Sequence, residues 1–492
     1  LAPAPEAAAM NKTSPTRKLA AIGIAAILFA VLAFLPLSDS VRRAGDALLD
    51  PKGQRAIAVL AGALVMWVLE ALPFHITGLL AMVMLALVGA GDFATIVKSG
   101  FGDDVVLFFI GVLALAAAIV RSGLGKRVSL LVLSITGNST RRIIFGFLAA
   151  GAFLSMWVTA MASSAIIMPL ALAILTEEGS KPGESRFGRA LMLAVAWGAL
   201  IGAVGTPAGS GSNPLVVKFM GSLAHIDISF VRWMTIGLPI VALLLPSAWG
   251  VLVLFSPPEM KSLRKSRDDI KREFSSQSRM SRDEKATLIV FAITVLIWLA
   301  SPLIQSLWHI KIPISMGAVA AVVLLFVPGM TSFKWKDLQK EIDWAGIILI
   351  AAGISLGMTL YQTGAAAWLS AVLLGGIGSL PLFIRLVLIV LAVLAVKIAF
   401  SSNTLTGTII VPLVLALGPR LGTGAAGLAL AAGFTANLAI ILVTTSPVNI
   451  IPYSTGYFSI KDMAIAGLIL TPLAALIIAL VFSILGPAMG IL

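Results

Sequence analysis

The sequence of 492 residues contains no cysteine and only three histidines, which stand far apart. The lack of cysteine excludes disulfides, iron–sulfur clusters and cysteine-based zinc sites. Charged residues are also scarce, at 12% of the chain, whereas 59% of the residues are hydrophobic and the mean hydropathy is +1.04. A soluble domain could not bury that much apolar surface. Many apolar runs approach or exceed 18 residues, so we predict an all-α polytopic protein that lies in a lipid bilayer.

The net charge of +13 does not indicate a nucleic-acid partner, because the basic residues lie between the apolar runs. Nine of the 35 basic residues fall within residues 256–286, and others lie at Lys12, Arg17 and Lys18. Basic residues of this kind favour the cytoplasmic side of a membrane. We therefore expect a cytoplasmic N-terminus, a cytoplasmic loop at 256–286 and an outside C-terminus, in a bacterial inner membrane.

Two segments that lie 243 residues apart have nearly the same pattern. Residues 159–170 and 402–413 both open with a short polar cluster and continue as Ile-Ile-x-Pro-Leu. A turn with Thr-Pro or Ser-Pro follows each of them, at residues 205–207 and 445–449. Duplicated hydrophobic segments that are interrupted by polar residues and proline are typical of secondary transporters whose site lies between inverted repeats.

The two polar clusters interrupt apolar stretches that are longer than one membrane span. Residues 141–175 and 381–417 each read as a re-entrant hairpin that is followed by a full helix. Together with the other apolar runs, they predict about 11 transmembrane helices plus two re-entrant hairpins. An odd number of spans would place the two halves in inverted orientation.

The polar cluster at residues 402–404 can bind an anion and a cation together. Non-helical backbone at membrane depth is costly unless it lines a cavity or a site. Free N–H groups at the start of a half-helix favour an anion, whereas carbonyl oxygens and the Asn403 side chain can coordinate Na⁺. The plainer alternative is that these polar side chains only satisfy a kinked helix. The matching turn at 445–449 and the repeat favour a site.

These residues resemble the divalent-anion/Na⁺ symporter family, which carries dicarboxylates, citrate or sulfate. Its mark is a Ser-Asn-Thr motif in each half, with a Thr-Pro-Pro-Asn-like turn, and residues 402–404 and 445–449 match it. Residues 67–73, 155–157 and 343–344 are similar to further family segments, so the resemblance covers most of the chain. It implies a homodimer in which a transport domain moves like an elevator against a fixed scaffold.

The resemblance also implies a division of the chain and a set of site residues. We expect an N-terminal tail at 1–18, in which residues 1–9 precede Met10 and are left out of the fold, scaffold helices at 19–140, a first transport half at 141–222, scaffold helices at 232–380 and a second transport half at 381–492. The expected substrate-binding residues are Ser402, Asn403, Thr404, Thr159, Thr206, Pro207, Ser446, Pro447, Asn449 and Lys397. The expected Na⁺ ligands are Asn403, Ser401, Thr445 and Ser155. No cofactor other than Na⁺ is expected.

The first half departs from the family pattern. Its motif reads Thr159-Ala160-Met161, in which Ala160 has no amide oxygen for a cation and Met161 carries a thioether in place of a hydroxyl. The turn at 205–214 reads as about four residues longer than the family turn, and its Gly-Ser-Gly-Ser run is either an anion nest or a linker. We therefore predict at most one Na⁺ site, in the second half.

Lys397 is an unusual charge, because it lies in the apolar run 386–400. It precedes Ser401 by one helical turn and Thr404 by two, so it lies on their helical face. Charges within a membrane are expensive and usually functional. Its ammonium could stand where the family holds Na⁺ or pair with the anion, or its long stem could snorkel to the surface.

The sequence predicts a secondary active transporter of small organic anions such as di- and tricarboxylates, coupled to Na⁺ through the second half. A Na⁺-independent anion exchanger of the same fold and a sulfate-type transporter remain alternatives. The broken hairpins oppose an anion channel. An intramembrane hydrolase would need a Ser–His or Asp–Asp pair in an apolar run, and an ATP-driven pump would need a Walker motif; the sequence has neither. The chain is therefore not expected to be an enzyme.

Overall fold

The computed structural model describes residues 15–134, 137–263, 279–418 and 424–492. These residues are mostly helical, and the strands among them are β1 (Arg43–Ala44) and β2 (Ala47–Leu48), which pair antiparallel. The predicted all-α class is confirmed. Residues 1–9 and residues 264–278 of the basic loop lie outside the described residues.

Seven helical segments of the described residues are long and apolar enough to cross a membrane, and five shorter apolar helices accompany them. A polytopic membrane protein is therefore confirmed, while the number of about 11 spans stays a prediction. The helices are α2 (Pro15–Phe34), α3 (Asp39–Arg42), α4 (Pro51–Val68), α5 (Phe74–Leu87), α6 (Phe93–Phe101), α7 (Asp104–Ser122), α8 (Leu124–Ser134), α9 (Thr140–Ser155), α10 (Ala160–Glu177), α11 (Arg186–Gly202), α12 (Ser212–Leu223), α13 (Phe230–Phe255), α15 (Arg282–Trp308), α16 (Ile314–Leu325), α17 (Trp335–Leu338), α18 (Trp344–Gln362), α19 (Ala365–Leu374), η1 (Gly375–Ser379), α20 (Leu382–Lys397), α21 (Asn403–Leu415), α23 (Gly424–Thr435), η2 (Val443–Thr445), α24 (Pro447–Tyr453) and α25 (Ile460–Ala488).

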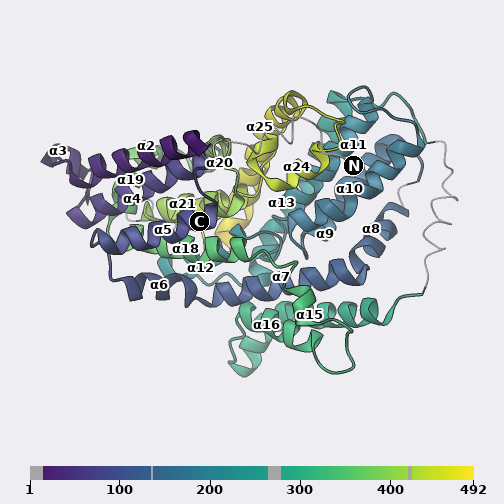
Figure 1. Cartoon of the computed structure of the whole chain (residues 1–492), viewed down its shortest axis with the longest axis horizontal. Helices are drawn as coiled ribbons and strands as arrows, with labels where there is room; N and C mark the ends of the chain where they lie inside the picture. The colour runs from purple at the N-terminus through teal and green to yellow at the C-terminus, as the bar shows by residue number, and fades with distance from the viewer. Residues whose placement is uncertain (1–14, 135–136, 264–278, 419–423) are drawn as a thin grey trace.

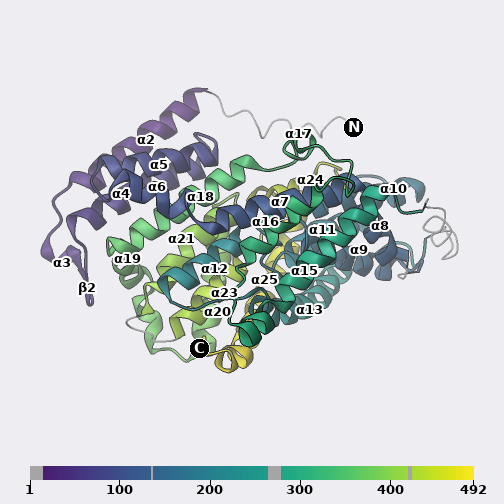
Figure 2. The ribbon, with the colours of Figure 1, turned by 90° about the horizontal axis from the view of Figure 1, so that it is seen from below.

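The helices form an elongated molecule. Helices α2 to α6 gather at one end, and helices α8 to α11 gather at the other (Figure 1). Figure 2 shows the same separation from below, with α12, α18 and α21 between the two ends and α15 crossing the face nearest to the viewer. The segments that carry the sequence repeat thus come from the middle of the molecule and from the end that holds α9 and α10.

The start of each half is built in the same way. Helices α7 and α18 have 19 residues each and begin after an aspartate, and the side chains of Asp103 and Asp343 accept hydrogen bonds from backbone N–H groups of their helix's first turn at 3.0 and 2.9 Å. Gly123 and Gly364 follow the two helices with φ of 86° and 70°, a conformation that glycine adopts at little cost. The repeat therefore extends to complete helices with equivalent ends.

Both predicted breaks occur where the polar clusters lie. Helix α9 ends at Ser155 and α10 begins at Ala160, while α20 ends at Lys397 and α21 begins at Asn403. In the first pair the chain doubles back, so that α10 lies against α9. Ser163 Oγ of α10 donates a hydrogen bond to the carbonyl of Gly151 in α9 at 2.9 Å. Both breaks therefore lie where the polar clusters predict them, while a re-entrant hairpin followed by a full helix in each segment stays a prediction.

Small residues allow the helices around the site to approach closely. Gly202 lies against the backbone of Ala152 in α9, and Gly198 lies against Leu148 one turn away. A Cβ at Gly353 of α18 would stand 2.6 Å from Thr408 Oγ1 of α21. These contacts fix α11 against α9 and α18 against α21, as is common in membrane proteins.

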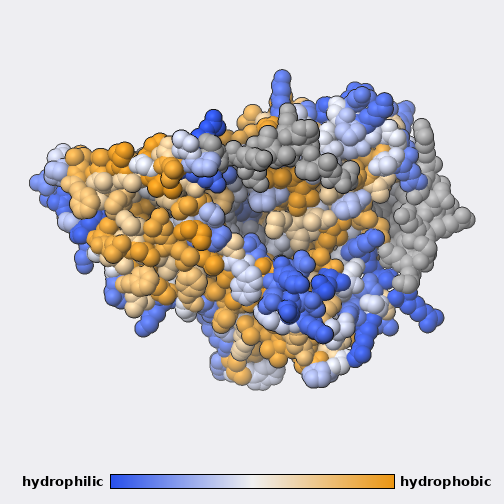
Figure 3. All heavy atoms as spheres, viewed as in Figure 1, coloured by the Kyte–Doolittle hydropathy of each residue, from blue (hydrophilic) through white to orange (hydrophobic). Residues whose placement is uncertain are grey.

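The end formed by α2 to α5 is covered with hydrophobic residues (Figure 3). On α2 alone, Leu19, Ile27 and Phe34 are each more than 60% exposed. An apolar surface of this extent is unfavourable in water and fits the interior of a bilayer.

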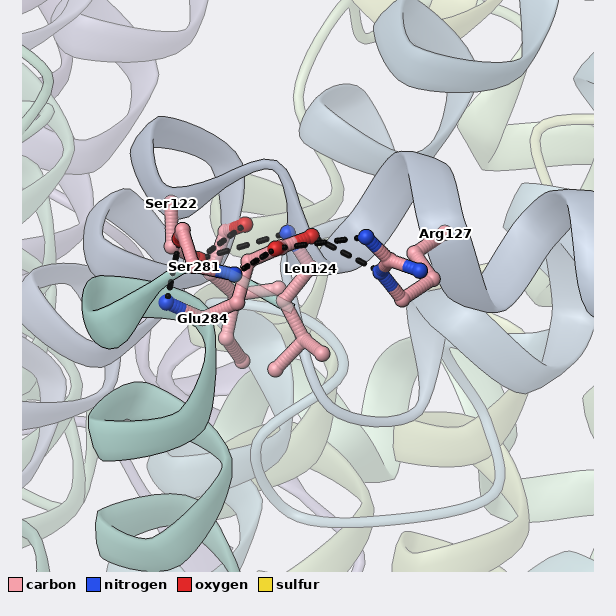
Figure 4. Close-up of polar contacts among 6 residues, drawn as sticks. Ser122, Leu124, Arg127, Ser281 and Glu284 are labelled. Atoms are coloured by element: carbon pink, nitrogen blue, oxygen red, sulfur yellow. Dashed lines mark hydrogen bonds and ion pairs between the residues drawn. The ribbon is translucent and has the colours of Figure 1, made fainter. Parts of the chain in front are cut away.

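A cluster of polar contacts fixes the start of α15, which follows the basic loop. Arg127 of α8 donates from Nε to Glu284 Oε1 at 2.9 Å (Figure 4). Glu284 also accepts the backbone N–H of Ser281 at 2.7 Å, which completes a capping box at the N-terminus of α15. The ion pair thus joins α8 to the start of α15.

Candidate functional site

A cavity of about 660 Å³ lies where the two halves meet. Both polar clusters line it, through residues 159–162 and 401–404, and so do the two turns, through residues 209–211 and 446–448. Segments that are 243 residues apart in the sequence are thus brought to one space. Its volume lies within the range of pockets for small organic molecules.

The N-termini of helices from both halves lie at this cavity. Thr159 caps α10 and Ser402 caps α21, and each side-chain oxygen accepts a backbone N–H of its helix at 3.3 Å. Gly211 precedes α12 and also lines the cavity. Helix N-termini carry partial positive charge and free N–H groups, so together they favour an anion.

Side-chain charge contributes little attraction for an anion. Among the residues that the structure describes, no lysine or arginine lines the cavity. The titratable lining residues are His75, Glu341 and Asp343, and the two carboxylates are exposed. Attraction for an anion must therefore come from backbone N–H groups, hydroxyls and helix dipoles.

The structure separates the predicted substrate-binding residues into two groups. The group that lines the cavity is Ser402, Asn403, Thr404, Thr159, Ser446 and Pro447. The group that does not is Thr206, Pro207, Asn449 and Lys397. Thr206 is fully buried, and its hydroxyl donates to the carbonyl of Met156 within the first break, so it braces the hairpin.

The two turns are held by one asparagine each, in the same way. The side-chain N–H groups of Asn213 and Asn449 each donate to the carbonyl ten residues earlier, at 2.8 and 2.7 Å. Each also donates to the carbonyl seven residues earlier, at 2.7 and 3.2 Å. Both amides therefore stabilise a turn of the same length between two helices.

The matched asparagines correct the predicted register of the first turn. Ser210 and Ser446 stand three residues before them, and each accepts the backbone N–H two residues later, at 3.5 and 3.4 Å. Residues 210–213 therefore correspond to 446–449, and the first turn is not longer than the second. The prediction that Thr206-Pro207 matches Ser446-Pro447 is wrong. The shared Ser-x-x-Asn spacing was the sequence signal for the right register.

Two asparagine oxygens in the second half have the properties of cation ligands. Asn403 Oδ1 and Asn449 Oδ1 are buried, and neither accepts a hydrogen bond within the part of the chain that the structure describes. A buried unpaired amide oxygen is costly unless it serves a ligand or an ion. These two residues fit Na⁺, which prefers oxygen ligands.

The other predicted Na⁺ ligands differ in their position. Ser401 lines the cavity, and its hydroxyl donates to Glu70 Oε1 at 3.2 Å. Thr445 is buried and donates its hydroxyl to Leu442 O at 2.6 Å. Ser155 lies outside the cavity lining and donates to a carbonyl of α11 at 2.6 Å.

Lys397 neither snorkels nor lines the cavity. Its side chain is 2% exposed, and its Nζ donates to Thr445 O at 3.0 Å and to Phe400 O at 3.4 Å. The salt bridges of the described residues do not include it. Phe400 directly precedes Ser401 and Thr445 directly precedes Ser446, so the ammonium connects the two breaks of the second half.

The sequence analysis left the Gly-Ser-Gly-Ser run open between an anion nest and a linker, and its residues Gly209, Ser210 and Gly211 line the cavity. Other lining residues were missed. Glu341 precedes α18 and His75 lies in the first turn of α5, and neither residue carries a repeat signal.

The comparisons with known proteins agree with the resemblance. The family model described as sodium:sulfate symporter transmembrane region matches residues 16–492. The sodium-dependent dicarboxylate transporter SdcS of Staphylococcus saprophyticus is 30% identical over 501 residues, which cover 98% of this chain and 94% of that protein. SdcS of Staphylococcus aureus strain NCTC 8325 is 30% identical over 452 residues, which cover 87% and 85%. The solved YdaH transporter of Alcanivorax borkumensis has 16% identity and a TM-score of 0.47, with 97% of both chains covered. The chain thus belongs to the sodium:sulfate symporter family of membrane transporters.

Proposed function

We propose that the chain is a secondary active transporter of di- or tricarboxylates that is coupled to Na⁺ through its second half. The observation that carries the proposal is the cavity into which both capped breaks and both turns open. The relatives that are named sodium-dependent dicarboxylate transporters support the same substrate class.

One carboxylate of the substrate binds at the second-half break. The hydroxyls of Ser402 and Thr404 and the first N–H groups of α21 are the donors there. The opposite wall contains Ala160 and Met161, which offer no comparable donors. The cavity therefore favours a di- or tricarboxylate whose two ends differ in polarity over one with two equivalent carboxylates.

The coupling ion binds beside that carboxylate. Asn403 Oδ1 and Asn449 Oδ1 supply two oxygens, and Ser401 supplies a hydroxyl at the cavity wall. This assignment moves Asn449 from the substrate to the cation. It also leaves the first half without an equivalent set, because Ala160 stands where Asn403 stands in the second half.

Transport proceeds by an elevator movement in a homodimer of the inner membrane. Contacts between the expected scaffold and the expected transport domain must break during that movement. They include the hydrogen bond between Ser401 and Glu70 and the ion pair between Lys218 of α12 and Asp103 at the start of α7.

A second candidate is a Na⁺-independent exchanger of the same fold. The observation that favours it is the Lys397 ammonium, which already binds the carbonyls of Phe400 and Thr445. A fixed positive charge there can balance a carboxylate during movement. Return of the empty carrier would then expose an unpaired charge, so exchange would be preferred.

Counterflow uptake into proteoliposomes tests the proposal. The purified protein is loaded with one anion and offered a labelled panel of mono-, di- and tricarboxylates and sulfate, with Na⁺ or K⁺ as the cation. Na⁺-stimulated uptake of a dicarboxylate-like anion is expected. Equal uptake in K⁺ would favour the exchanger, and uptake of sulfate without any carboxylate would overturn the substrate class.

A further inference from the structure

A buried polar cluster lies behind the first-half turn, and it includes a residue from the other half of the chain. Asn437 follows α23, and its side-chain N–H donates to Asn213 Oδ1 at 2.7 Å. Ser212 Oγ in turn donates to Asn437 Oδ1 at 2.6 Å. Ser210 Oγ lies 3.3 Å from Ser212 Oγ and also lines the cavity. All four side chains are less than 8% exposed.

This cluster creates a difference between two turns that are otherwise equivalent. Asn213 and Asn449 hold their turns through the same pair of backbone carbonyls. The oxygen of Asn449 is left without a donor among the described residues, whereas the oxygen of Asn213 receives the N–H of Asn437. Asn437 therefore occupies the position from which a cation would reach Asn213 Oδ1.

We propose that Asn437 is a specificity-determining residue that closes the first-half cation position and thereby limits the number of coupling ions. This inference rests on the proposed Na⁺ coupling of the second half. An amide N–H is a neutral donor, so it satisfies the oxygen of Asn213 without binding an ion from solution. The first half then keeps its turn intact without a cation.

The chemistry of the cluster predicts what a single substitution does. In Asn437→Asp, the donor to Asn213 Oδ1 is lost and a carboxylate replaces it. The cluster then offers oxygens from this carboxylate, Asn213, Ser212 and Ser210, all of which are buried. A hard cation such as Na⁺ prefers this set, and the buried carboxylate needs a counter-charge.

The experiment compares thermal stability of the purified full-length protein in Na⁺ and in K⁺ at equal ionic strength, without substrate. Asn437→Asp should gain a saturable Na⁺-dependent rise in Tm of about 2–4 °C beyond that of the unsubstituted protein. Asn437→Leu, which keeps four side-chain heavy atoms branched at Cγ but no polar group, should show no such gain. Thr435→Val is the matched control, since within the described ranges the Thr435 hydroxyl bonds only Ala431 O, at 2.7 Å, outside the cluster.

Two further measurements test whether Asn437 closes the first-half cation position if Asn437→Asp does not fold. Asn437→Ser removes the amide with less strain, and it should also gain Na⁺-dependent stability, to a smaller extent. In the unsubstituted protein, direct binding of labelled Na⁺ should saturate at no more than one ion per chain. Two ions per chain, or no Na⁺ gain in a folded Asn437→Asp protein, would overturn the inference. Because these readouts need no transport, failure of carboxylate uptake would count against the proposed function alone.

Discussion

Replacement of Lys397 by methionine separates the two candidate transport modes. Methionine keeps an unbranched apolar side chain of similar length, so the substitution removes the ammonium with little change in packing. The carbonyls of Thr445 and Phe400, which accept from Nζ at 3.0 and 3.4 Å, then lose their donor. A mobile Na⁺ can take its place.

The size of the effect follows from these bonds. A hydrogen bond to a charged group contributes about 1.5–3 kcal/mol. If the shorter bond holds the second break in its binding geometry, kcat/KM for uptake should fall about 10- to 150-fold. The remaining uptake should respond more strongly to Na⁺ than that of the unsubstituted protein.

Counterflow in proteoliposomes, with Na⁺ exchanged for K⁺, measures both kcat/KM for uptake and the response of uptake to Na⁺. Arg385→Met is the matched control, because it removes a cation from the same helix twelve residues earlier, where Arg385 bonds Leu380 O and no other group among the residues that the structure describes. Unchanged uptake, exchange stoichiometry and Na⁺ response in Lys397→Met would refute a role of the ammonium in transport.

Three other outcomes are expected. Asn403→Ala should abolish transport at normal expression, since loss of a buried amide that serves a ligand typically costs about 1–3 kcal/mol or more; uptake at the normal rate would remove Asn403 from the site. In this cysteine-free chain, an Asp103→Cys/Lys218→Cys pair should be joined by a bifunctional maleimide whose length matches the former ion pair, and uptake should then stop. Either single variant should keep its uptake after the same treatment, and full uptake by the cross-linked protein would contradict an elevator movement between α7 and α12. Burial alone would raise the pKa of Glu259, but hydrogen bonds from Ser185 Oγ at 2.5 Å and from a backbone N–H at 2.8 Å outweigh it and hold the pKa below its ordinary value of 4.5. The contribution of Glu259 to the free energy of unfolding is therefore present above pH 4.5 and is lost as the pH falls through the lowered pKa. Glu259→Gln should make the free energy of unfolding depend less on pH in the acid range. An unchanged dependence would exclude this linkage.

The breaks of the helices could be predicted from the sequence because their signals are local. Polar clusters that interrupt apolar runs mark the ends of α9 and α20, and Pro412, three residues before the end of α21, does not stop that helix. The repeat of these local patterns was enough to predict that residues 159 and 402 approach one cavity. Family resemblance added the substrate class.

The register of the first turn and the partners of its side chains could not be predicted in the same way. Thr206-Pro207 has the composition expected of the turn motif, but the hydrogen bonds of Asn213 place the equivalent residues four positions later. The contacts of Lys397 with Thr445 and of Asn437 with Asn213 join residues 48 and 224 positions apart. Such contacts depend on tertiary packing, which no local pattern records.

The central claim is that the cavity between the two halves binds the substrate. Protection of a single cysteine in the cavity against chemical labelling tests this claim most directly. Ala162 lines the cavity, and Ala162→Cys would introduce the sole cysteine of the chain. The rate at which a small maleimide labels this cysteine should fall several-fold when a dicarboxylate and Na⁺ are present, and labelling of Lys334→Cys, which is exposed and outside the cavity, should not change. Labelling of Ala162→Cys at an unchanged rate, with every di- and tricarboxylate tested and with Na⁺ present, would show that the cavity is not the substrate site.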